Sequence, residues 1–386
     1  MKIKDICTSV TDGSHNPPQG IEKSEYMMLS SKNIFDDEIT FDEPRFLSEK
    51  DFEREHKRTQ IAVGDVLLTI VGTVGRTAVV DEDMPAFALQ RSVAVLHPKN
   101  DVCLPRFLMY ALRGKRTYIE NRAKGVAQKG IYLKEVSDID IYIPDISNQE
   151  IIINKLDKVN TIIKLRQEEL LALDNLIKAR FVELFECGDH EIVKASDVCD
   201  FITKGTTPPT GEITEEYENG KIPFLKVYNL SFTGEMLFDE NPQYILAETH
   251  NGKLARSKVY PNDVLMNIVG PPLGKFTLVT DEFEEWNINQ AIAIFRAKER
   301  ILPRFLLHAL MQPKVLEPFI GQAVGIRQQN LSLEQCRNLQ FPLPSLEEQK
   351  SFVEFAEQLD KSKVAVQKAL DETQMLFDSL MQEYFG

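Results

Sequence analysis

The chain has 386 residues, 43% of them hydrophobic, and a formal net charge of −14 at pH 7. This length and hydrophobic content exclude a disordered protein and predict two or more domains with substantial cores. The acidic balance argues against nucleic-acid binding over the whole surface, so a basic contact region has to be sought locally.

Three further absences narrow the class of protein. No apolar run approaches the ~20 residues that span a bilayer, and MKIKDICTSVTDGSH (1–15) has no apolar core of an export signal. The five cysteines are scattered without a CxxC pair, which suits reduced thiols, so we expect a cytoplasmic protein. The six histidines form no zinc-binding spacing, and we expect no metal site.

The first 145 residues have the pattern of a mixed domain with short strands and helices. Strand-like runs at VLLTIVG (66–72), TAVVD (77–81) and SVAVLH (92–97) precede a short helix at RFLMYALRG (106–114). The stretch 105–134 holds eight basic residues and one acidic residue, Glu120. This imbalance favours contact with a polyanion, and a solvated helix face is the alternative.

A glycine-rich loop, IVGTVGR (70–76), joins the first two of these strands. A phosphate-binding loop needs four residues between its glycines and a helix behind its basic residue. Here two residues separate Gly72 from Gly75, and a strand follows Arg76. We therefore expect a hairpin turn in which glycine supplies a positive φ angle and Arg76 is presented to nucleic acid.

Residues 147–187 contain neither glycine nor proline and predict one uninterrupted helix. One row of a coiled-coil seam recurs every seven residues, at Leu156, Ile163, Leu170, Ile177 and Leu184. The stretch 345–386 carries rows of the same kind. Two seams in one chain favour pairing with each other over pairing between chains. About 38 residues of helix span ~57 Å, which predicts a dumb-bell with a domain at each end.

Residues 188–344 repeat the order of the first domain at a nearly constant offset. LPRFLMYAL matches LPRFLLHAL and IVGTVGR matches IVGPPLGK, both 198 residues later, so Lys275 is the counterpart of Arg76. DGSHNPP matches KGTTPPTG, LSSKNI matches LKVYNL, and IPDISNQE matches FPLPSLEEQK with Gln149 opposite Gln349. One ancestral unit is therefore present twice, each copy being a domain followed by a long helix.

The stretch HNPPQ (15–19) is close to the NPP-aromatic motif by which adenine-N6 methyltransferases hold their target base. The aromatic position is occupied by Gln19, no glycine-rich cofactor motif precedes it, and the second copy lacks the asparagine. We interpret both stretches as proline turns. No nuclease pattern and no Ser/His/Asp grouping stands out either, so we expect no catalytic residue in this chain.

Basic and polar side chains at equivalent places of the two copies are the candidate DNA-binding residues. Arg, Lys, Asn and Gln can bond to purine edges, while basic neighbours hold phosphates. In the first copy they are Lys32, Asn33, Arg76, Gln90, Arg91, Lys124, Gln128 and Lys129. In the second copy they are Lys204, Tyr228, Asn229, Lys275, Asn289, Gln290, Arg327 and Gln328. Singly, each is more often an ordinary surface residue; as a set that differs between copies, they predict two domains that recognise different sequences.

The ordered set of motifs resembles the specificity (S) subunits of type I restriction–modification systems over essentially the whole chain. The resemblance rests on the two-copy layout, the glycine loops with Gln90 and Gln290 downstream, and PLPSLEEQK (342–350) before the final helix. It implies an α+β fold of two similar mixed α/β target recognition domains separated by two long antiparallel coiled-coil helices, an internal pseudo-two-fold repeat. We accordingly expect target recognition domain 1 at 1–145, the central long helix (conserved region 1) at 146–187, target recognition domain 2 at 188–344 and the C-terminal long helix (conserved region 2) at 345–386.

The resemblance also implies a function and partners. Each domain would recognise one half of a bipartite site in double-stranded DNA, while the coiled coil sets the spacer and docks two methyltransferase (M) subunits. The chain would be non-catalytic and without a cofactor, because S-adenosylmethionine (SAM), ATP and Mg²⁺ belong to the M subunits, which methylate adenine N6, and the restriction (R) subunits. Two alternatives remain: a stand-alone coiled-coil DNA-binding or scaffold protein, and a nucleotide-binding enzyme that uses the glycine loops.

Overall fold

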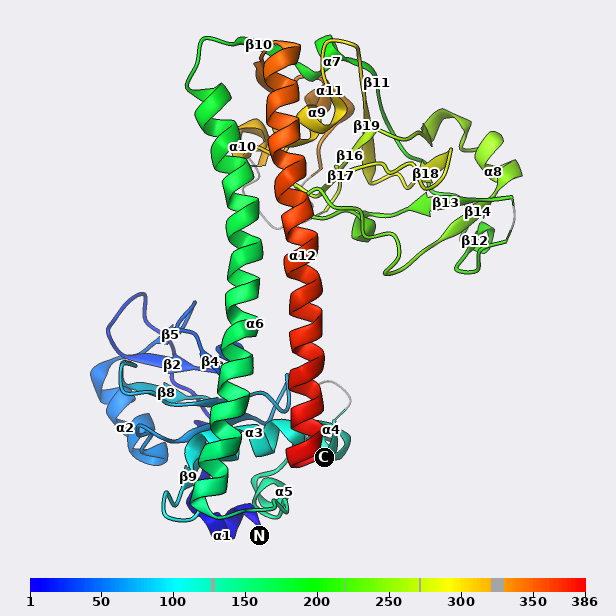
Figure 1. Cartoon of the computed structure of the whole chain (residues 1–386). Coiled ribbons are helices and arrows are strands. Elements are labelled where there is room, and N and C mark those ends of the chain that lie inside the picture. The colour runs from blue at the N-terminus through cyan, green and yellow to red at the C-terminus, as the bar shows by residue number, and fades with distance from the viewer. Residues whose placement is uncertain (126–128, 219, 271, 321–329) are drawn as a thin grey trace. The chain divides into compact units, whose positions relative to one another are not determined.

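The computed structural model describes residues 1–125, 129–218, 220–270, 272–320 and 330–386 (Figure 1). The chain divides into two compact units. Unit 1 comprises Met1–Arg166 and Lys368–Gly386, and unit 2 comprises Gln167–Gln367. Each unit therefore contains one mixed domain together with a part of each long helix.

The central sheet of unit 1 is antiparallel, with the strand order β1-β9-β6-β7. Its strands are β1 (Cys7–Asp12), β6 (Val66–Thr69), β7 (Thr77–Val79) and β9 (Val93–Pro98). A second sheet, in the order β5-β2-β8, contains β2 (Met27–Leu29), β5 (Arg45–Phe46) and β8 (Phe87–Leu89), and a hairpin pairs β3 (Ile34–Phe35) with β4 (Glu38–Ile39). The helices are α1 (Ile3–Ile6), α2 (Glu49–Thr59), α3 (Pro105–Gly114), α4 (Arg116–Arg122) and α5 (Leu133–Ser137). The expected strands and the expected short helix of the first copy are confirmed.

Unit 2 has a central sheet of the same order, β11-β19-β16-β17. Its strands are β11 (Cys199–Lys204), β16 (Val264–Asn267), β17 (Phe276–Leu278) and β19 (Ile292–Ala297). The second sheet, in the order β12-β14-β13-β18-β15, contains β12 (Ile213–Thr214), β13 (Lys221–Leu225), β14 (Tyr244–Leu246), β15 (Lys258–Val259) and β18 (Trp286–Ile288), while β10 (Glu191–Lys194) pairs with β20 (Gln340–Leu343). The helices are α7 (Ala195–Val198), α8 (Ala247–Asn251), α9 (Pro303–Leu310), α10 (Pro313–Ile320) and α11 (Leu333–Arg337), with 3₁₀ turns at Thr210–Glu212, Val227–Asn229 and Ala255–Ser257.

Irregular details of the two central sheets also recur. The register of β1 on β9 shifts between Cys7 and Ser9, and that of β11 on β19 shifts between Cys199 and Phe201. A parallel strand pairing links β2 with β8 in unit 1 and β13 with β18 in unit 2. Since bulges are specific features of a strand pair rather than defects, their repetition supports the duplication inferred from the sequence.

The continuous apolar runs VLLT and VLMN are explained by burial on both faces of each sheet. Leu68 packs into the core shared with α3, while its neighbour Leu67 packs against the second sheet. In unit 2, Met266 and Leu265 divide in the same way. A strand covered on both faces has no exposed side to carry polar residues, so it does not alternate.

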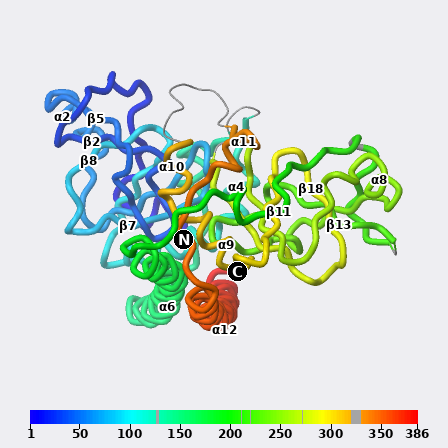
Figure 2. Tube along the Cα trace, turned by 90° about the horizontal axis from the view of Figure 1, so that it is seen from above, coloured from blue at the N-terminus to red at the C-terminus, as the bar shows by residue number. Residues whose placement is uncertain are grey.

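The two long helices are α6 (Ile146–Phe181), which continues as a π-turn over Val182–Glu186, and α12 (Leu346–Phe385). In unit 2, Asp174 of α6 bonds Lys363 of α12 at 2.8 Å, and Phe181 lies 5.5 Å from Phe352. Moving forward along α6 therefore means moving backward along α12, so the helices are antiparallel. Figure 2 shows them next to each other. Of the expected seam residues of α6, Leu156, Ile163 and Ile177 are buried, while Leu170 and Leu184 are half-buried. On α12, Phe352, Val366 and Phe377 are buried.

The end of α12 completes the core of unit 1. Phe385 lies 5.3 Å from Phe107 of α3, and Phe377 shares the same core. A β-carbon at Gly114 would lie 2.5 Å from that of Phe385, so the two helices meet closely at a residue without a side chain. In unit 2 the end of α6 takes this place, with Phe181 5.4 Å from Phe305 of α9. The fold is thus two similar mixed domains joined by two antiparallel helices. Across the described ranges, no helix has the length and apolar content needed to cross a membrane.

Candidate nucleic-acid interface

The two glycine loops are hairpin turns, as expected. Gly72 and Gly75 have φ angles of 85° and 96° between the antiparallel strands β6 and β7. Gly270 and Gly274, between β16 and β17, have φ angles of 97° and 98°. Positive φ explains the glycines, and the following strand leaves no helix N-terminus behind the loop to hold a phosphate.

The basic residue that ends each loop stacks on an aromatic ring. The guanidinium of Arg76 lies 4.9 Å from the ring centre of Phe35, and the ammonium of Lys275 lies 5.6 Å from that of Phe232. Both rings are exposed, at 39% and 48%. Arg76 and Lys275 are therefore half-buried, and each cation lies over an exposed aromatic ring instead of extending freely into solvent from the turn.

A second pair of turns, which we call the recognition turns, carries adjacent polar side chains. They are Gln90–Arg91 between β8 and β9, and Asn289–Gln290 between β18 and β19. The backbone N–H of Gln90 donates to Leu29 O at 2.9 Å, and the backbone N–H of Asn289 donates to Leu225 O at 3.0 Å. The backbone of both turns is thus held in the same frame.

A glycine allows another strand to pass close beside each recognition turn. A β-carbon at Gly13 would lie 2.1 Å from Leu89 O, and one at Gly205 would lie 2.0 Å from Asn289 O. Atoms cannot approach so closely, so neither position accepts a side chain without backbone movement. This close passage places Ser14, at 4% exposure, against the first recognition turn, where Arg91 N donates to Ser14 O at 2.9 Å.

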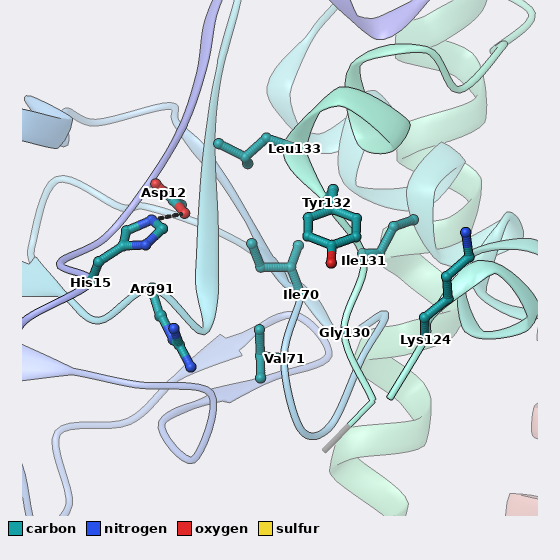
Figure 3. Close-up of a pocket in the computed structure, with 10 residues that line it drawn as sticks. All are labelled: Asp12, His15, Ile70, Val71, Arg91, Lys124, Gly130, Ile131, Tyr132 and Leu133. Carbon is teal, nitrogen blue, oxygen red and sulfur yellow. Dashed lines mark hydrogen bonds and ion pairs between the residues drawn. The ribbon is translucent and has the colours of Figure 1, made fainter. Parts of the chain in front are cut away.

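Three adjoining cavities of unit 1, with volumes of about 490, 260 and 500 Å³, form a surface that we call groove 1. The first and second share His15, Val71 and Arg91, and the second and third share Ser30, Lys32 and Gln90. Figure 3 shows the first cavity, with Arg91 and Lys124 on opposite sides. Groove 1 therefore brings together five of the predicted residues, Lys32, Asn33, Gln90, Arg91 and Lys124.

Among the described residues, the middle cavity of groove 1 is lined by the cations Lys32 and Arg91 and by no carboxylate, whereas Asp12 lines the first cavity and Asp42 and Glu43 line the third. Lys32, Arg91 and Lys124 are exposed and make no side-chain hydrogen bond or ion pair within the described ranges. Asp12 is held by His15 at 2.7 Å and by Arg58 at 3.2 Å, so its charge is compensated locally. A surface with unpaired cations and hydrogen-bonding side chains between them suits a phosphate-bearing polymer.

Groove 1 also contains residues that the sequence did not single out. These are Ser14, His15 and Ser31, together with Arg45, whose guanidinium donates to Pro18 O at 2.9 Å. The sequence shows that the segment DGSHNPP, which supplies Ser14 and His15, is repeated, but it predicts only a proline turn there. Repetition of a segment with exposed polar residues was the available signal.

Asn33 and Asn229 are placed differently from the expectation that they face DNA. Asn33 is 4% exposed, accepts from Ser30 N at 3.1 Å and donates to Asp42 O at 2.8 Å. Asn229 is fully buried and makes the same pair of bonds, with Lys226 N at 2.9 Å and Leu237 O at 3.1 Å. Both amides hold their own loop together, and Asn33 also lines the third cavity of groove 1.

Two other expected residues of unit 1, Gln128 and Lys129, lie at the edge of one of the described ranges. Lys129 is exposed, and its carbonyl accepts from Gly72 N at 3.0 Å, which ties this segment to the glycine loop. Gln128, like Arg327 and Gln328 of the second copy, lies outside the described residues.

In unit 2 the expected residues Lys204, Tyr228 and Gln290 are exposed. Partial burial raises the pKa of the Tyr228 phenol, so the hydroxyl remains a donor at neutral pH. Gln290 N lies 3.4 Å from Thr207 Oγ1, and the side chain of Asn289 accepts from Ala291 N at 3.1 Å. Arg256, absent from the sequence prediction, donates to Thr206 at 3.0 Å next to this turn. The same frame thus carries different side chains in unit 2.

Half of the basic run 105–134 serves the fold instead of a polyanion. Arg106 bonds Asp157 of α6, and Arg113 stacks on Phe377 of α12 at 4.6 Å. Lys115 Nζ donates to Phe385 O at 3.1 Å, and Arg116 bonds Gly75 O and Asp36. Contact with a polyanion, which the sequence predicts for the whole run, therefore remains an expectation only for the other basic residues, of which Lys124 lines groove 1.

The hairpin β3–β4 is fastened to the helices of unit 1 by Asp37, whose side chain is 9% exposed. Asp37 pairs with Arg106 at 3.0 Å and Lys164 at 3.2 Å and accepts from Asn160 at 2.7 Å. In unit 2, Glu235 pairs with the buried Lys363 of α12 at 3.3 Å. Each domain is thus joined through an acidic residue to the long helix that follows it.

The comparisons with known proteins agree on one family. The model of the type I restriction modification DNA specificity domain matches residues 1–175 and 188–373. The EcoBI specificity subunit of Escherichia coli is 26% identical over 186 residues, which are 47% of this chain but 38% of that protein. The MjaVIII specificity subunit of Methanocaldococcus jannaschii is 25% identical over 309 residues, which are 73% of this chain and 71% of that protein.

Two solved structures share the fold. One comes from work on complex assembly and conformational transition of the type I R-M system; its TM-score is 0.56 at 18% identity, over 100% of this chain and 96% of that one. The other is the S subunit of a type I restriction-modification system from M. genitalium, with a TM-score of 0.51 at 14% identity, over 100% and 95%.

Proposed function

This chain belongs to the type I restriction modification DNA specificity domain family, and on that premise we propose that it is the DNA-reading subunit of a restriction–modification complex. Residues 1–145 and 188–344 serve as the two target recognition domains, each for one half of a bipartite site. Residues 146–187 and 345–386 serve as the conserved helical regions between them.

The observation that carries this proposal is the pair of recognition turns. Equivalent backbone frames hold Gln90–Arg91 in unit 1 and Asn289–Gln290 in unit 2. Two domains of one design with different side chains at the same place are suited to two different half-sites. Groove 1 adds the unpaired cations that phosphate contact requires.

The chain acts with other subunits that carry out the chemistry. Two M subunits methylate adenine N6 with SAM, and R subunits use ATP and Mg²⁺. The exposed apolar side chains of the long helices in unit 1 support a docking role, since such side chains on a soluble protein favour a partner surface. They are Ile151, Ile162 and Leu165 on α6 and Met375 and Leu376 on α12, all at least 45% exposed.

Two measurements test the proposal together. The full chain, purified from its own cells, should carry an adenine methyltransferase through size exclusion. Methyladenine mapped across the genome should occupy a bipartite sequence that loses its methylation when the gene is deleted. A chain that purifies alone and leaves the methylation map unchanged would instead be a stand-alone DNA-binding or scaffold protein.

A further inference from the structure

The positions of Arg91 and Gln290 are equivalent in the two copies although their side chains differ. Each is the second residue of its recognition turn, and each turn closes with the same bond: Val93 N to Gln90 O at 3.1 Å, and Ile292 N to Asn289 O at 3.2 Å. Gly13 and Gly205 fix the neighbouring strand against both turns. A constant frame with a variable side chain is the arrangement expected of a specificity position.

Arg91 occupies the middle of groove 1. It lines both the first and the second cavity, with Lys124 in the first and Lys32 in the second. Figure 3 shows Arg91 beside Val71 on one wall of the first cavity, across from Lys124. A central guanidinium between two outer ammonium groups matches an interface in which the outer groups hold phosphates and the centre faces base edges.

The two side chains differ in the base that they can recognise. The guanidinium fork of arginine donates two hydrogen bonds to O6 and N7 of guanine, whereas glutamine donates to N7 and accepts from N6 of adenine. Glutamine carries no charge, so a purely phosphate-holding role would not be retained at this position in both copies.

We infer that Arg91 and Gln290 each determine one base pair of the bipartite site, a G·C pair in the half read by unit 1 and an A·T pair in the half read by unit 2. This inference rests on the proposed function and adds the base class at one position of each half-site. Gln90 and Asn289, the first residues of the turns, are half-buried, whereas Arg91 and Gln290 are exposed.

The test uses the complex purified with its methyltransferase partners and a pool of duplex DNA randomised over the site. Arg91→Gln should change one base pair of one half-site from G·C to A·T, with discrimination of roughly 5- to 150-fold, and leave the other half unchanged. Gln290→Arg should make the reverse change in the other half only. Arg54→Gln, an exposed arginine on α2 that lines no part of groove 1, is the matched control.

A third variant separates base contact from phosphate contact. Arg91→Lys keeps the charge but loses the planar fork, so it should relax the G·C preference while the salt dependence of binding stays the same. If Arg91→Gln lowers affinity equally for every sequence and Arg91→Lys restores it, Arg91 holds a phosphate and the inference is wrong. If the unmodified complex selects no sequence at all, the proposed function itself fails; thermal unfolding of each variant shows that it is folded.

Discussion

Gln149 and Gln349 make the same three hydrogen bonds in the two copies. Gln149 Oε1 accepts from Leu104 N at 2.8 Å, and its amide donates to Val102 O and Pro144 O at 2.8 and 2.9 Å. Gln349 accepts from Leu302 N at 2.9 Å and donates to Arg300 O and Pro344 O at 3.1 and 2.9 Å. Both side chains are fully buried. Each glutamine therefore ties the first turn of a long helix to the segment that precedes α3 or α9.

Replacing either glutamine with alanine should destabilise its own unit by about 2–3 kcal/mol, because a buried N–H and two carbonyls lose their partner. The midpoint of urea unfolding, followed separately in each unit by hydrogen exchange, measures the loss. Gln358→Ala, at an exposed site of α12, is the control and should change little. Equal midpoints for Gln349→Ala and Gln358→Ala would contradict the proposed anchoring role.

Asp37→Asn should loosen the hairpin β3–β4 by roughly 1–3 kcal/mol, because Arg106 and Lys164 lose a charged partner. Faster exchange of the Asp37 amide, which donates to Thr77 O at 2.9 Å, would report this opening. Asp83→Asn, at an exposed site in the same domain, serves as the control. An unchanged exchange rate in Asp37→Asn would show that the ion pairs do not hold the hairpin.

Acidification should destabilise unit 2 through His308. Burial, assisted by the nearby charge of Arg304, lowers the pKa of His308 to about 4 from its ordinary value of 6.5. Between pH 6.5 and 4 the unfolded chain therefore binds a proton at His308 that the folded chain does not. The contribution of neutral His308 to the free energy of unfolding is present in full above pH 6.5 and is lost as the pH falls toward 4. The loss amounts to roughly 3 kcal/mol.

His308→Tyr removes this titration and introduces the residue found at the equivalent position of unit 1, Tyr110. The dependence of unit 2 stability on pH between 6.5 and 4 should become shallower in this variant. It should not vanish, because burial also lowers the pKa of His250. A slope equal to that of the unmodified chain would exclude His308 as its source.

Removing one heptad from the middle of each long helix should shorten the permitted DNA spacer. Seven residues correspond to about 10 Å of helix at ~1.5 Å each, or about three base pairs at ~3.4 Å. Methylation mapping of the shortened protein reads the spacer directly, and removal of a heptad from α6 alone is the control that should prevent assembly. A full-length spacer in the doubly shortened protein would refute the role of the helices in setting it.

The repeat, the strands around the glycine loops and the helix seam could be predicted because local periodicity and turn residues determine them. The glycines of IVGTVGR fit a hairpin whatever surrounds it, and Gln149 and Gln349 were marked by their equivalent places. The burial of Asn33 and Asn229 could not be predicted, because the sequence does not distinguish an asparagine that bonds its own loop from one that faces solvent.

The basic run 105–134 shows the limit most clearly. The partner of Lys115, the carbonyl of Phe385, lies 270 residues away along the chain. Nothing in the composition of the run distinguishes a lysine that meets a helix end from one that meets a phosphate. The cavities of groove 1 likewise combine residues from Asp12 to Leu133, whose proximity follows from strand pairing and not from their spacing.

The placement of Phe377 and Phe385 in the core of unit 1 has a consequence for synthesis on the ribosome. All residues of unit 2 lie within Gln167–Gln367, whereas unit 1 needs Lys368–Gly386 as well as Met1–Arg166. A chain emerges from the ribosome from its N-terminus onward. The domain of unit 1 is therefore translated first but cannot complete its apolar core until all residues of unit 2 have been translated. Nascent unit 1 therefore leaves apolar core residues exposed until the last residues of α12 have been made.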